Sequence, residues 1–466
     1  MNFYDDIKLY GESTAIITDG YEKISYNTLL QDADELNNII NKRCIVFSMC
    51  KNCYESVLGY IGFLRGRIVP VMISENINRS LFKNLLNLYK PKYIWLPKEK
   101  VEELDEFIEV YNKANYVLLK TNYDMNYTLS EELALLLTTS GSTGSPKLVR
   151  QSYKNITSNA NAIVEYLNIT NIDRAVTTLP MSYTYGLSII NSHLLNGASI
   201  ILTEKTLMDR VFWELLKSNN ATTFGGVPYT YEILKKLRFA KMNLQSLKVI
   251  TQAGGKLSPE MSKEFATICE KKGIKFYVMY GQTEATARMS YLSPEYSISK
   301  VGSIGLAIPK GKFSLRDGEG NDINECETVG ELVYQGDNVT MGYAESCVDL
   351  NKGDENKGIL VTGDMAKMDE DGFYYIVGRK KRFLKLFGSR VNLDEMEHLL
   401  KLAGVECVCS GIDDNLKIYL TDESNISKVK NFVTEYTDIN PAGFKIYHVE
   451  VIPRNEAGKV LYSALK

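Results

Sequence analysis

The chain has 466 residues, of which 44% are hydrophobic and 24% are charged, and its 54 Lys and Arg residues nearly balance 57 Asp and Glu residues. This composition is typical of a globular protein with two or three structural units, and it lacks the charge excess that would favour a nucleic-acid partner or an anionic membrane. There is no basic and apolar leader and no run of about 18 uncharged apolar residues, so we expect no membrane span and a cytoplasmic location.

The cysteines and histidines give no sign of a metal centre or a hydrolase. The closest cysteine pairs, Cys50/Cys53 and Cys407/Cys409, lack the second pair of ligands that a zinc site requires. The three histidines form no cluster that would suggest a metal or a Ser-His dyad. We therefore expect reduced, buried thiols and a different kind of chemistry.

Short β-branched runs alternate with helical patterns from residue 43 onward, which is typical of βα units with parallel strands. The expected strands of the first part cover residues 44–49, 68–73, 93–96, 116–119 and 133–138. Apolar residues at helical spacing then predict a helix over 156–167, and further strands are expected near Ala175, Ser199, Leu247 and Lys275. Most of the chain is therefore predicted to be α/β.

The sequence pattern changes beyond residue 301. Short strands punctuated by glycines predict a β-rich subdomain over 301–378. A concentrated basic stretch at 378–390 marks the expected boundary between a domain at 1–380 and a domain at 381–466. The second domain alternates short strands with two helical patterns, which predicts a small α+β fold.

The strongest local signal is a glycine-rich loop directly after the apolar run 133–138. Residues 138–147 read Thr-Thr-Ser-Gly-Ser-Thr-Gly-Ser-Pro-Lys. Hydroxyls and open backbone N–H groups flanked by glycines can wrap a polyphosphate, and Lys147 can add positive charge; a polar surface turn is the alternative. The P-loop of kinases and ATPases fits poorly, because Pro146 offers no N–H and Leu148 offers no hydroxyl to Mg²⁺.

Five further motifs follow in order: Leu-Pro-Met-Ser-Tyr-Thr-Tyr-Gly at 179–186, Tyr-Gly-Gln-Thr-Glu at 280–284, Thr-Gly-Asp at 362–364, Gly-Arg opening 378–390, and Asn-Glu-Ala-Gly-Lys-Val at 455–460. Together with the glycine loop, they resemble the signatures of the acyl-adenylate-forming superfamily, which includes acyl- and aryl-coenzyme A synthetases, firefly luciferase and peptide-synthetase adenylation domains. The resemblance implies an α/β fold in which a large N-terminal domain of two βα-layered sheets carries a small β-barrel-like subdomain and is followed by a small, mobile α+β lid.

The resemblance also implies a nucleotide site. The residues expected to bind ATP or AMP are Thr139, Ser140, Gly141, Ser142, Thr143, Gly144, Lys147, Gly254, Gly255, Tyr280, Gly281, Gln282, Asp364 and Arg379. Tyr280 would stack on adenine, Thr283 would bond the α-phosphate, and Glu284 would ligate Mg²⁺, while Asp364 would accept the ribose hydroxyls. The ordinary alternatives are a satisfied loop carboxylate at Glu284, a turn-forming Asp at 364 and a solvated charge at Arg379.

Lys459 is the residue expected to matter most for catalysis, together with Thr283 and Glu284. By resemblance it enters the site as the C-terminal domain pivots at Lys381, and its ammonium screens a carboxylate from a triphosphate, an effect worth about 10²–10³ in rate. A solubility charge near the C-terminus is the alternative. The basic run around Lys381 could mimic a nucleic-acid patch, but its glycine-bounded, apolar-interleaved pattern fits a hinge and β-loop better.

The expected acyl pocket comprises Tyr183, Thr184, Tyr185 and Gly186, with the stretches 223–229 and 252–255 as further walls. Many relatives carry a His after a Phe in this motif, and amino-acid-activating domains carry an Asp nearby, whereas this chain has Ser-Tyr-Thr-Tyr. A buried ammonium without an acidic partner would be costly, so a small carboxylic acid is favoured over an α-amino acid. The tyrosine hydroxyls favour a polar acyl group.

The predicted enzyme is an acid–thiol ligase that uses ATP and Mg²⁺. The acid attacks the α-phosphorus and releases pyrophosphate, and a thiol then displaces AMP from the acyl-AMP. The acceptor is coenzyme A or the phosphopantetheine of an acyl or peptidyl carrier protein, and the compact C-terminal domain favours the carrier protein. The alternatives are a stand-alone amino-acid adenylating enzyme, a non-catalytic nucleotide-binding protein and a P-loop phosphotransferase.

Overall fold

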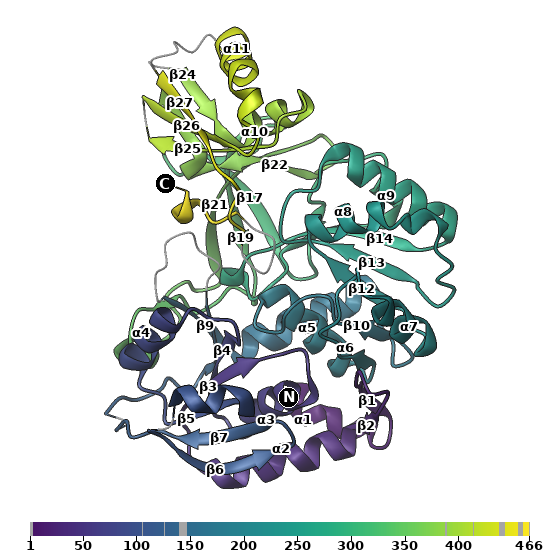
Figure 1. Cartoon of the computed structure of the whole chain (residues 1–466), viewed down its shortest axis with the longest axis vertical. Coiled ribbons are helices and arrows are strands. Elements are labelled where there is room, and N and C mark those ends of the chain that lie inside the picture. Colours follow the sequence, from purple (N-terminus) through teal and green to yellow (C-terminus); the bar gives the residue numbers. More distant parts are fainter. Residues whose placement is uncertain are drawn as a thin grey trace. The chain divides into compact units, whose positions relative to one another are not determined.

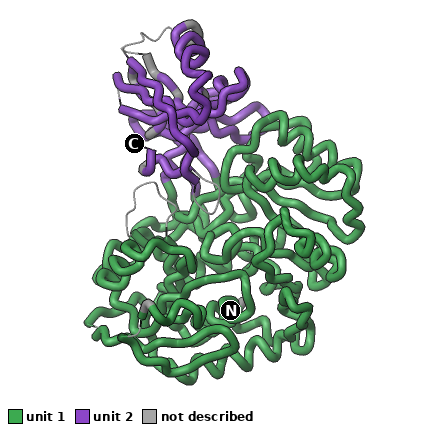
Figure 2. The backbone as a smooth tube through the Cα atoms, in the orientation of Figure 1, with its two compact units in different colours: residues 1–139, 145–312, 335–360 green, residues 140–144, 313–334, 361–466 purple. Residues whose placement is uncertain are grey.

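The computed structural model describes residues 3–104, 106–124, 126–138, 147–386, 389–412, 414–437, 443–454 and 460–465. The chain divides into two compact units, shown in different colours in Figure 2. The first unit comprises residues 1–139, 145–312 and 335–360, and the second comprises 140–144, 313–334 and 361–466. The stretches 313–334 and 361–378 of the predicted β-rich segment thus group with the C-terminal residues, whereas 301–312 and 335–360 belong to the first unit. The domain boundary predicted at residue 380 stays a prediction.

One sheet of the first unit has nine strands in the order β16-β15-β14-β13-β12-β10-β11-β1-β2 (Figure 1). The central strands run parallel: β14 (Lys275–Tyr280), β13 (Val249–Gln252), β12 (Thr223–Gly226), β10 (Arg174–Val176), β11 (Ser199–Ile201) and β1 (Thr14–Ile17). The edge strands are antiparallel: β2 (Lys23–Ser25), β15 (Ser290–Leu292) and β16 (Leu306–Ala307). The strands expected near Ala175, Ser199, Leu247 and Lys275 are confirmed.

Helices cover both faces of this sheet. On one face, α7 (Arg210–Ser218), α8 (Pro228–Lys236) and α9 (Pro259–Lys272) share an apolar core with the parallel strands. On the other face, α6 (Thr184–Leu195) packs beside α5 (Tyr153–Leu167), which begins at a capping box formed by Ser152 and Asn155. Residues alternate between the two faces of a strand, so β13 buries Ile250 against α8 and α9 and presents Thr251 to α6.

A second sheet of the first unit has eight strands in the order β20-β9-β8-β4-β3-β5-β7-β6. Its bounds are β20 (Tyr343–Ala344), β9 (Leu148–Ser152), β8 (Leu133–Thr138), β4 (Val69–Ser74), β3 (Ile45–Cys50), β5 (Tyr93–Pro97), β7 (Tyr116–Lys120) and β6 (Ile108–Lys113). The helices packed on it are α2 (Tyr26–Ile40), α3 (Tyr54–Arg65) and α4 (Arg79–Tyr89), and a short α1 (Phe3–Asp6) contacts α3.

All five strands expected in the first part of the chain are present, but the sheet is mixed. Strands β8, β4, β3 and β5 are parallel, whereas β7 pairs antiparallel with β5, and β9 pairs antiparallel with β8. The sequence did not predict β6, whose side chains are mostly exposed, or β9, which follows the glycine loop. Two residues join β6 to β7, and a connection this short permits only an antiparallel pair.

Five strands of the predicted β-rich segment form a sheet of the second unit in the order β18-β17-β19-β21-β22, whereas β16 and β20 belong to the sheets of the first unit. The five strands are β18 (Asp322–Ile323), β17 (Lys312–Arg316), β19 (Gly330–Gln335), β21 (Ile359–Met368) and β22 (Tyr374–Arg379). The basic run then forms a short 3₁₀ turn and a hairpin of β23 (Phe383–Leu386) and β24 (Ser389–Asn392).

The C-terminal part of the second unit is α+β, as expected. Its three-stranded sheet contains β25 (Cys407–Ile412), β26 (Asn415–Leu420) and β27 (Phe444–His448), and it shares a core with α10 (Leu393–Leu402) and α11 (Ile426–Thr437). Across the part of the chain that is described, no helix has the length and apolar character needed to span a bilayer. The cytoplasmic location stays a prediction.

Candidate active site

Two loops that carry predicted site residues leave the same edge of the nine-stranded sheet. Strands β12, β13 and β14 are parallel, and their register pairs Gly226 with Gln252 and Gln252 with Val278. The turn at Gly254 and Gly255 and the loop beginning after Tyr280 therefore emerge together at the carboxyl ends of neighbouring strands. Open α/β sheets bind ligands at this edge, so the structure brings two predicted segments to a favourable place.

The loop after β14 folds back tightly on itself. The backbone N–H of Met289 donates to the carbonyl of Tyr280, and a short 3₁₀ turn, Thr283–Ala285, lies between them. A Cβ atom added at Gly281 would lie 1.8 Å from the carbonyl oxygen of Ala287, so this position accepts only glycine without a backbone shift. The motif glycine is thus required by the loop's own fold, independently of any ligand.

Glu284 is held at this loop by residues that follow much later in the chain. Its carboxylate Oε1 accepts a hydrogen bond of 2.6 Å from the hydroxyl of Tyr343, and its carbonyl accepts bonds from the N–H and the hydroxyl of Thr340. Burial and the neighbouring Glu284 carboxylate raise the pKa of Tyr343, so its hydroxyl stays protonated and donates. Tyr343 was not predicted as a site residue, since no local pattern marks a partner 59 residues away.

Glu284 fits a magnesium site of the kind that relies on the nucleotide. Within the residues that the structure describes, no group of three or more His, Cys, Asp or Glu side chains is placed to hold a metal ion. Mg²⁺ is usually bound by one or two carboxylates, and phosphate oxygens and waters supply the other ligands. A single half-buried carboxylate is therefore a sufficient contribution from the protein to a site of this kind.

The glycine loop connects two paired strands. Residues 139–146, which include the predicted Thr139, Ser140, Gly141, Ser142, Thr143 and Gly144, lie outside the described residues. The ends of the loop are defined, because Thr138 of β8 pairs with Leu148 of β9. A P-loop leads from a strand into a helix, whereas this loop leads from a strand into an antiparallel strand, which argues against the phosphotransferase alternative.

Lys147, at the end of this loop, is paired with a carboxylate. Its Nζ lies 2.6 Å from Oε1 of Glu345, and the two side chains are 46% and 66% exposed. An exposed ion pair of this kind contributes about 0–1 kcal/mol and is screened by salt. Lys147 is therefore held by a weak surface contact, which another anion can displace.

The four residues of the predicted acyl pocket start α6 and lie against the edge of the sheet. The hydroxyl of Tyr185 is 2.7 Å from Oγ1 of Thr251 on β13, and the hydroxyl of Thr184 donates to the carbonyl of Thr286. A Cβ at Gly254, where φ is +82°, would lie 2.7 Å from the hydroxyl of Tyr183. The structure thus brings the 183–186 motif into contact with the Gly254 turn.

The hydroxyls of Tyr183 and Tyr185 stay neutral, because the pKa of each is raised. Burial raises the pKa of Tyr183 to about 12. Burial also raises the pKa of Tyr185, although the nearby Arg288 guanidinium opposes the shift. Because Tyr185 uses its hydroxyl on Thr251, its contribution to the pocket is mainly its ring.

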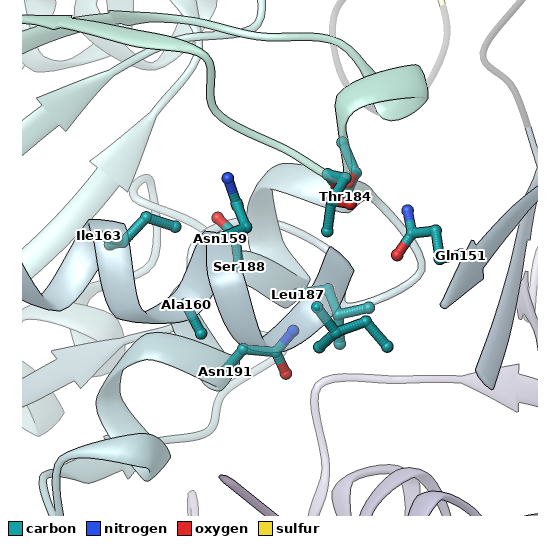
Figure 3. A pocket seen from close by; sticks show the side chains of 10 residues that line it. Gln151, Asn159, Ala160, Ile163, Thr184, Leu187, Ser188 and Asn191 are labelled. Carbon is teal, nitrogen blue, oxygen red and sulfur yellow. The ribbon is translucent and has the colours of Figure 1, made fainter. Parts of the chain in front are cut away.

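A small pocket lies behind α6, between α6 and α5 (Figure 3). Its lining includes Thr184 and Ser188 from α6 and Asn159 from α5, and Figure 3 shows their side chains around the pocket with Asn191 and Gln151. The buried atoms Nε2 of Gln151 and Oδ1 of Asn191 have no hydrogen-bond partner. The layer between α5 and α6 therefore mixes polar side chains with apolar ones such as Ile163 and Leu187, and Gln151 and Asn191 keep unused hydrogen-bonding atoms there.

In the second unit, Asp364 and Arg379 face each other across β21 and β22. The two residues are paired in the register of these strands, and Nε of Arg379 lies 3.2 Å from Oδ1 of Asp364. The Asp364 side chain is buried, while Arg379 is largely exposed. The structure thus brings these two predicted nucleotide residues together, and the carboxylate is positioned by its neighbour.

Lys381 belongs to the 3₁₀ turn Lys380–Arg382 between β22 and β23. This position directly follows the strand of Arg379, as a hinge would require. Lys459 lies outside the described residues, which end one segment at Arg454 and resume at Val460, where the two residues form an isolated bridge. The catalytic role predicted for Lys459 therefore stays a prediction.

Comparison with known proteins gives a family match and consistent structural neighbours. A family model described as "AMP-binding enzyme" matches residues 3–344. The 2-succinylbenzoate–CoA ligase of Bacillus velezensis is 28% identical over 346 residues, which cover 72% of this chain and 69% of that protein. The ligase of the same name from Bacillus subtilis is 28% identical over 352 residues, which cover 73% and 70% of the two chains.

Two solved structures share the fold. O-succinylbenzoate coenzyme A synthetase (MenE) from Bacillus subtilis, in complex with AMP, is 21% identical with a TM-score of 0.80, covering 100% of this chain and 98% of that chain. ATP-bound MatB from Rhodopseudomonas palustris is 20% identical with a TM-score of 0.80 and the same coverage. The predicted fold class is therefore confirmed.

Proposed function

Since the match over residues 3–344 shows that the chain belongs to the AMP-binding enzymes, we propose that it joins a small carboxylic acid to coenzyme A in two steps driven by Mg·ATP. The resemblance inferred from the motifs is confirmed, and the chain is an adenylate-forming ligase. The observation that carries the proposal is the shared edge of β12, β13 and β14, where the Gly254 turn and the Tyr280–Glu284 loop emerge together. The substrate, the acceptor and the individual residue roles are the proposed part.

For the nucleotide, we assign Tyr280 to adenine, Thr283 to the α-phosphate and Asp364 to the ribose. Asp364 suits this role because Arg379 holds its buried carboxylate in place. Glu284 would hold Mg²⁺, which neutralises phosphate charge when bound, and Tyr343 would orient the carboxylate by its hydrogen bond. Lys147 and the glycine loop would bind the β- and γ-phosphates.

The chemistry needs charge screening more than acid–base catalysis. The acid is already ionised at neutral pH, so no general base has to act on it. The main obstacle is the repulsion between the carboxylate and the triphosphate, and in-line positioning with nearby positive charge lowers it. We assign the mobile positive charge to Lys459 and the pivot of its domain to Lys381.

Coenzyme A is the better-supported acceptor. The curated relatives at 28% identity are named as CoA ligases, and they give no support to the carrier protein that the compact C-terminal domain favoured. The amino-acid alternative is weakened by a specific contact, because the charged group packed on Tyr185 is the guanidinium of Arg288. A cation in this place would repel the α-ammonium of an amino acid.

The test separates the two half-reactions. Lys459→Ala should lower ATP–pyrophosphate exchange by about 10²–10³-fold while leaving thioester formation from supplied acyl-adenylate intact. Lys445→Ala, at an exposed position on β27, is the matched control and should change neither rate. Equal loss of both half-reactions would contradict the role of Lys459. The wild-type protein releasing no pyrophosphate with any acid of a panel of aliphatic, aryl and amino acids would contradict the proposed function.

A further inference from the structure

Arg288 is a buried cation whose partners in the structure are all neutral. Its side chain is 2% exposed and lies in the segment between the Glu284 loop and β15. Its Nε donates to the hydroxyl of Ser188 at 3.2 Å, and its Nη1 donates to the hydroxyl of Tyr166 at 3.0 Å and the sulfur of Met279 at 3.3 Å. Its guanidinium carbon lies 5.1 Å from the centre of the Tyr185 ring. No carboxylate among the described residues pairs with it.

Arg150, the other arginine among the described residues that is as deeply buried as Arg288, has a countercharge. Arg150 is fully buried and pairs with Glu355, and Arg382 pairs with Asp394 and Glu397. A buried charge without a partner is strongly unfavourable, because desolvation is not offset by an opposite charge. Arg288 therefore differs from Arg150 and Arg382 in having no carboxylate partner, and we infer that a ligand supplies its countercharge.

The environment of Arg288 places that ligand on the acyl side of the active site. Tyr185, under the guanidinium, belongs to the acyl motif, and Ser188 lies one turn later on α6. Ser188 also lines the small pocket of Figure 3. The Nη2 nitrogen makes no hydrogen bond to a described residue and is not among the fully enclosed polar atoms, so two N–H groups remain available.

We propose that Arg288 binds a second anionic group of the acyl substrate, so that the acid activated by this enzyme is a dicarboxylic acid. The proposal rests on the proposed function and specifies its substrate class. The reacting carboxylate has to lie beside the phosphates near Thr283 and Glu284, and the second carboxylate, at the far end of the acid, pairs with Arg288. A guanidinium suits this task, since its planar N–H groups match the two oxygens of a carboxylate.

A purely structural role for Arg288 makes a different prediction. Its acceptors already have other bonds: the Ser188 hydroxyl donates to the carbonyl of Tyr185 at 2.7 Å, and the Tyr166 hydroxyl donates to the sulfur of Met279 at 3.1 Å. Replacing Arg288 by methionine therefore leaves no polar group orphaned and removes an unpaired buried charge. We expect Arg288→Met to keep or raise the melting temperature of the free protein, whereas a structural arginine would lower it.

The first experiment measures kcat/KM for pyrophosphate release with matched pairs of acids: malonic, succinic, glutaric and adipic acid, each against its own monoamide. The wild-type protein should prefer at least one diacid over its monoamide by about 10²-fold, because charge-assisted hydrogen bonds to the second carboxylate are lost in the amide. Arg288→Met should lose this preference mainly through KM for the diacid. Arg210→Met removes an arginine that is 91% exposed on α7, and this control should keep the preference.

The second experiment needs no turnover, so it separates the two proposals. Each diacid and its monoamide are added to the full chain, and the melting temperature is recorded for wild type, Arg288→Met and Arg210→Met. The diacid that fits should stabilise wild type and Arg210→Met more than its monoamide does, and Arg288→Met should show no difference. If no acid releases pyrophosphate but this pattern holds, the proposed function fails and the anion site stands. Equal effects of diacid and monoamide on wild type in both experiments, or a lower melting temperature of Arg288→Met, would overturn the role of Arg288.

Discussion

Arg288 in the first unit and Arg382 in the second are both buried arginines, and they differ in what surrounds the charge. The Arg382 side chain is 13% exposed, its Nε pairs with Asp394, and its Nη2 lies 2.6 Å from Glu397. Its guanidinium also stacks 4.4 Å above the ring of Tyr462. Arg288 has a comparable ring contact but only neutral hydrogen-bond partners. In the second unit the arginine charge is thus neutralised by two carboxylates of the chain. In the first unit the arginine charge is left without a carboxylate of the chain to pair with it.

The position of the two acids explains why Arg382 is structural. Asp394 and Glu397 lie in the first turns of α10, where the helix dipole favours negative charge. Burial raises the pKa of Glu397, and the Arg382 charge and the N–H of Cys409 oppose that shift. The arginine and the helix end therefore stabilise each other, and no ligand is needed.

The largest effect is expected for Arg382→Met. This change leaves Glu397, which is 21% exposed, and Asp394, which is 37% exposed, without a countercharge, so the free energy of unfolding should fall by about 2–3 kcal/mol, less than for a fully buried pair. Urea unfolding, followed by a probe in the second unit, measures this change, and Arg210→Met should stay within about 0.5 kcal/mol of wild type. If Arg382→Met lowered the free energy of unfolding no more than Arg288→Met does, the structural role of Arg382 would be contradicted.

The sequence predicted the parts of the site that depend on local pattern. The Tyr280–Glu284 motif was expected at the end of a strand, and it begins with the last residue of β14; Asp364 and Arg379 were expected in one site, and they face each other. The partners Tyr343 of Glu284 and Glu345 of Lys147 were not predicted. Such contacts join residues far apart in the chain, and a single sequence contains no local pattern that pairs them.

The role of Arg288 could not be predicted from the sequence either. In the sequence it is one charged residue soon after a recognised motif, and nothing there distinguishes a buried cation from a solvated one. Its meaning depends on what surrounds it, which only the packing of α5, α6 and β14 reveals. By contrast, the roles of the glycine loop and Lys459 were inferred from resemblance alone, and they stay predictions because residues 139–146 and 455–459 lie outside the described residues.

A smaller effect, on the pH dependence of stability, is expected at His193, whose pKa is lowered in part by the charge of Arg288. Burial, with a smaller contribution from the Arg288 charge, lowers the pKa of His193 to about 4, although the carbonyl of Ile189 and the Asp173 carboxylate oppose the shift. The folded state thus holds the neutral ring, whereas the unfolded chain binds a proton near pH 6.5. The stability contribution is complete above pH 6.5 and is lost as the pH falls towards 4, at about 1.4 kcal/mol per pH unit.

Two measurements check this expectation. Urea unfolding between pH 7 and pH 5 should show a steeper loss of stability for wild type than for His193→Leu, and equal slopes would contradict the buried neutral ring. NMR titration of the histidine signals should then show the His193 pKa rising when a diacid binds, because an anion beside Arg288 offsets its charge. An unchanged His193 pKa with saturating diacid would count against an anion at Arg288.

The smallest effect is expected at Lys147, whose charge is compensated at the surface. Glu345→Gln removes the partner of Lys147, so ATP no longer has to displace an ion pair worth about 0–1 kcal/mol, and KM for ATP should fall by up to about fivefold with kcat unchanged. Glu214→Gln, which breaks the exposed pair with Arg210, is the matched control and should leave KM unchanged. The difference should vanish at about 1 M salt, where the screening length is about 3 Å. A rise in KM would mean that Glu345 positions Lys147 for the phosphate. The paired charge of Lys147 would then serve ligand binding, as we propose for the unpaired charge of Arg288.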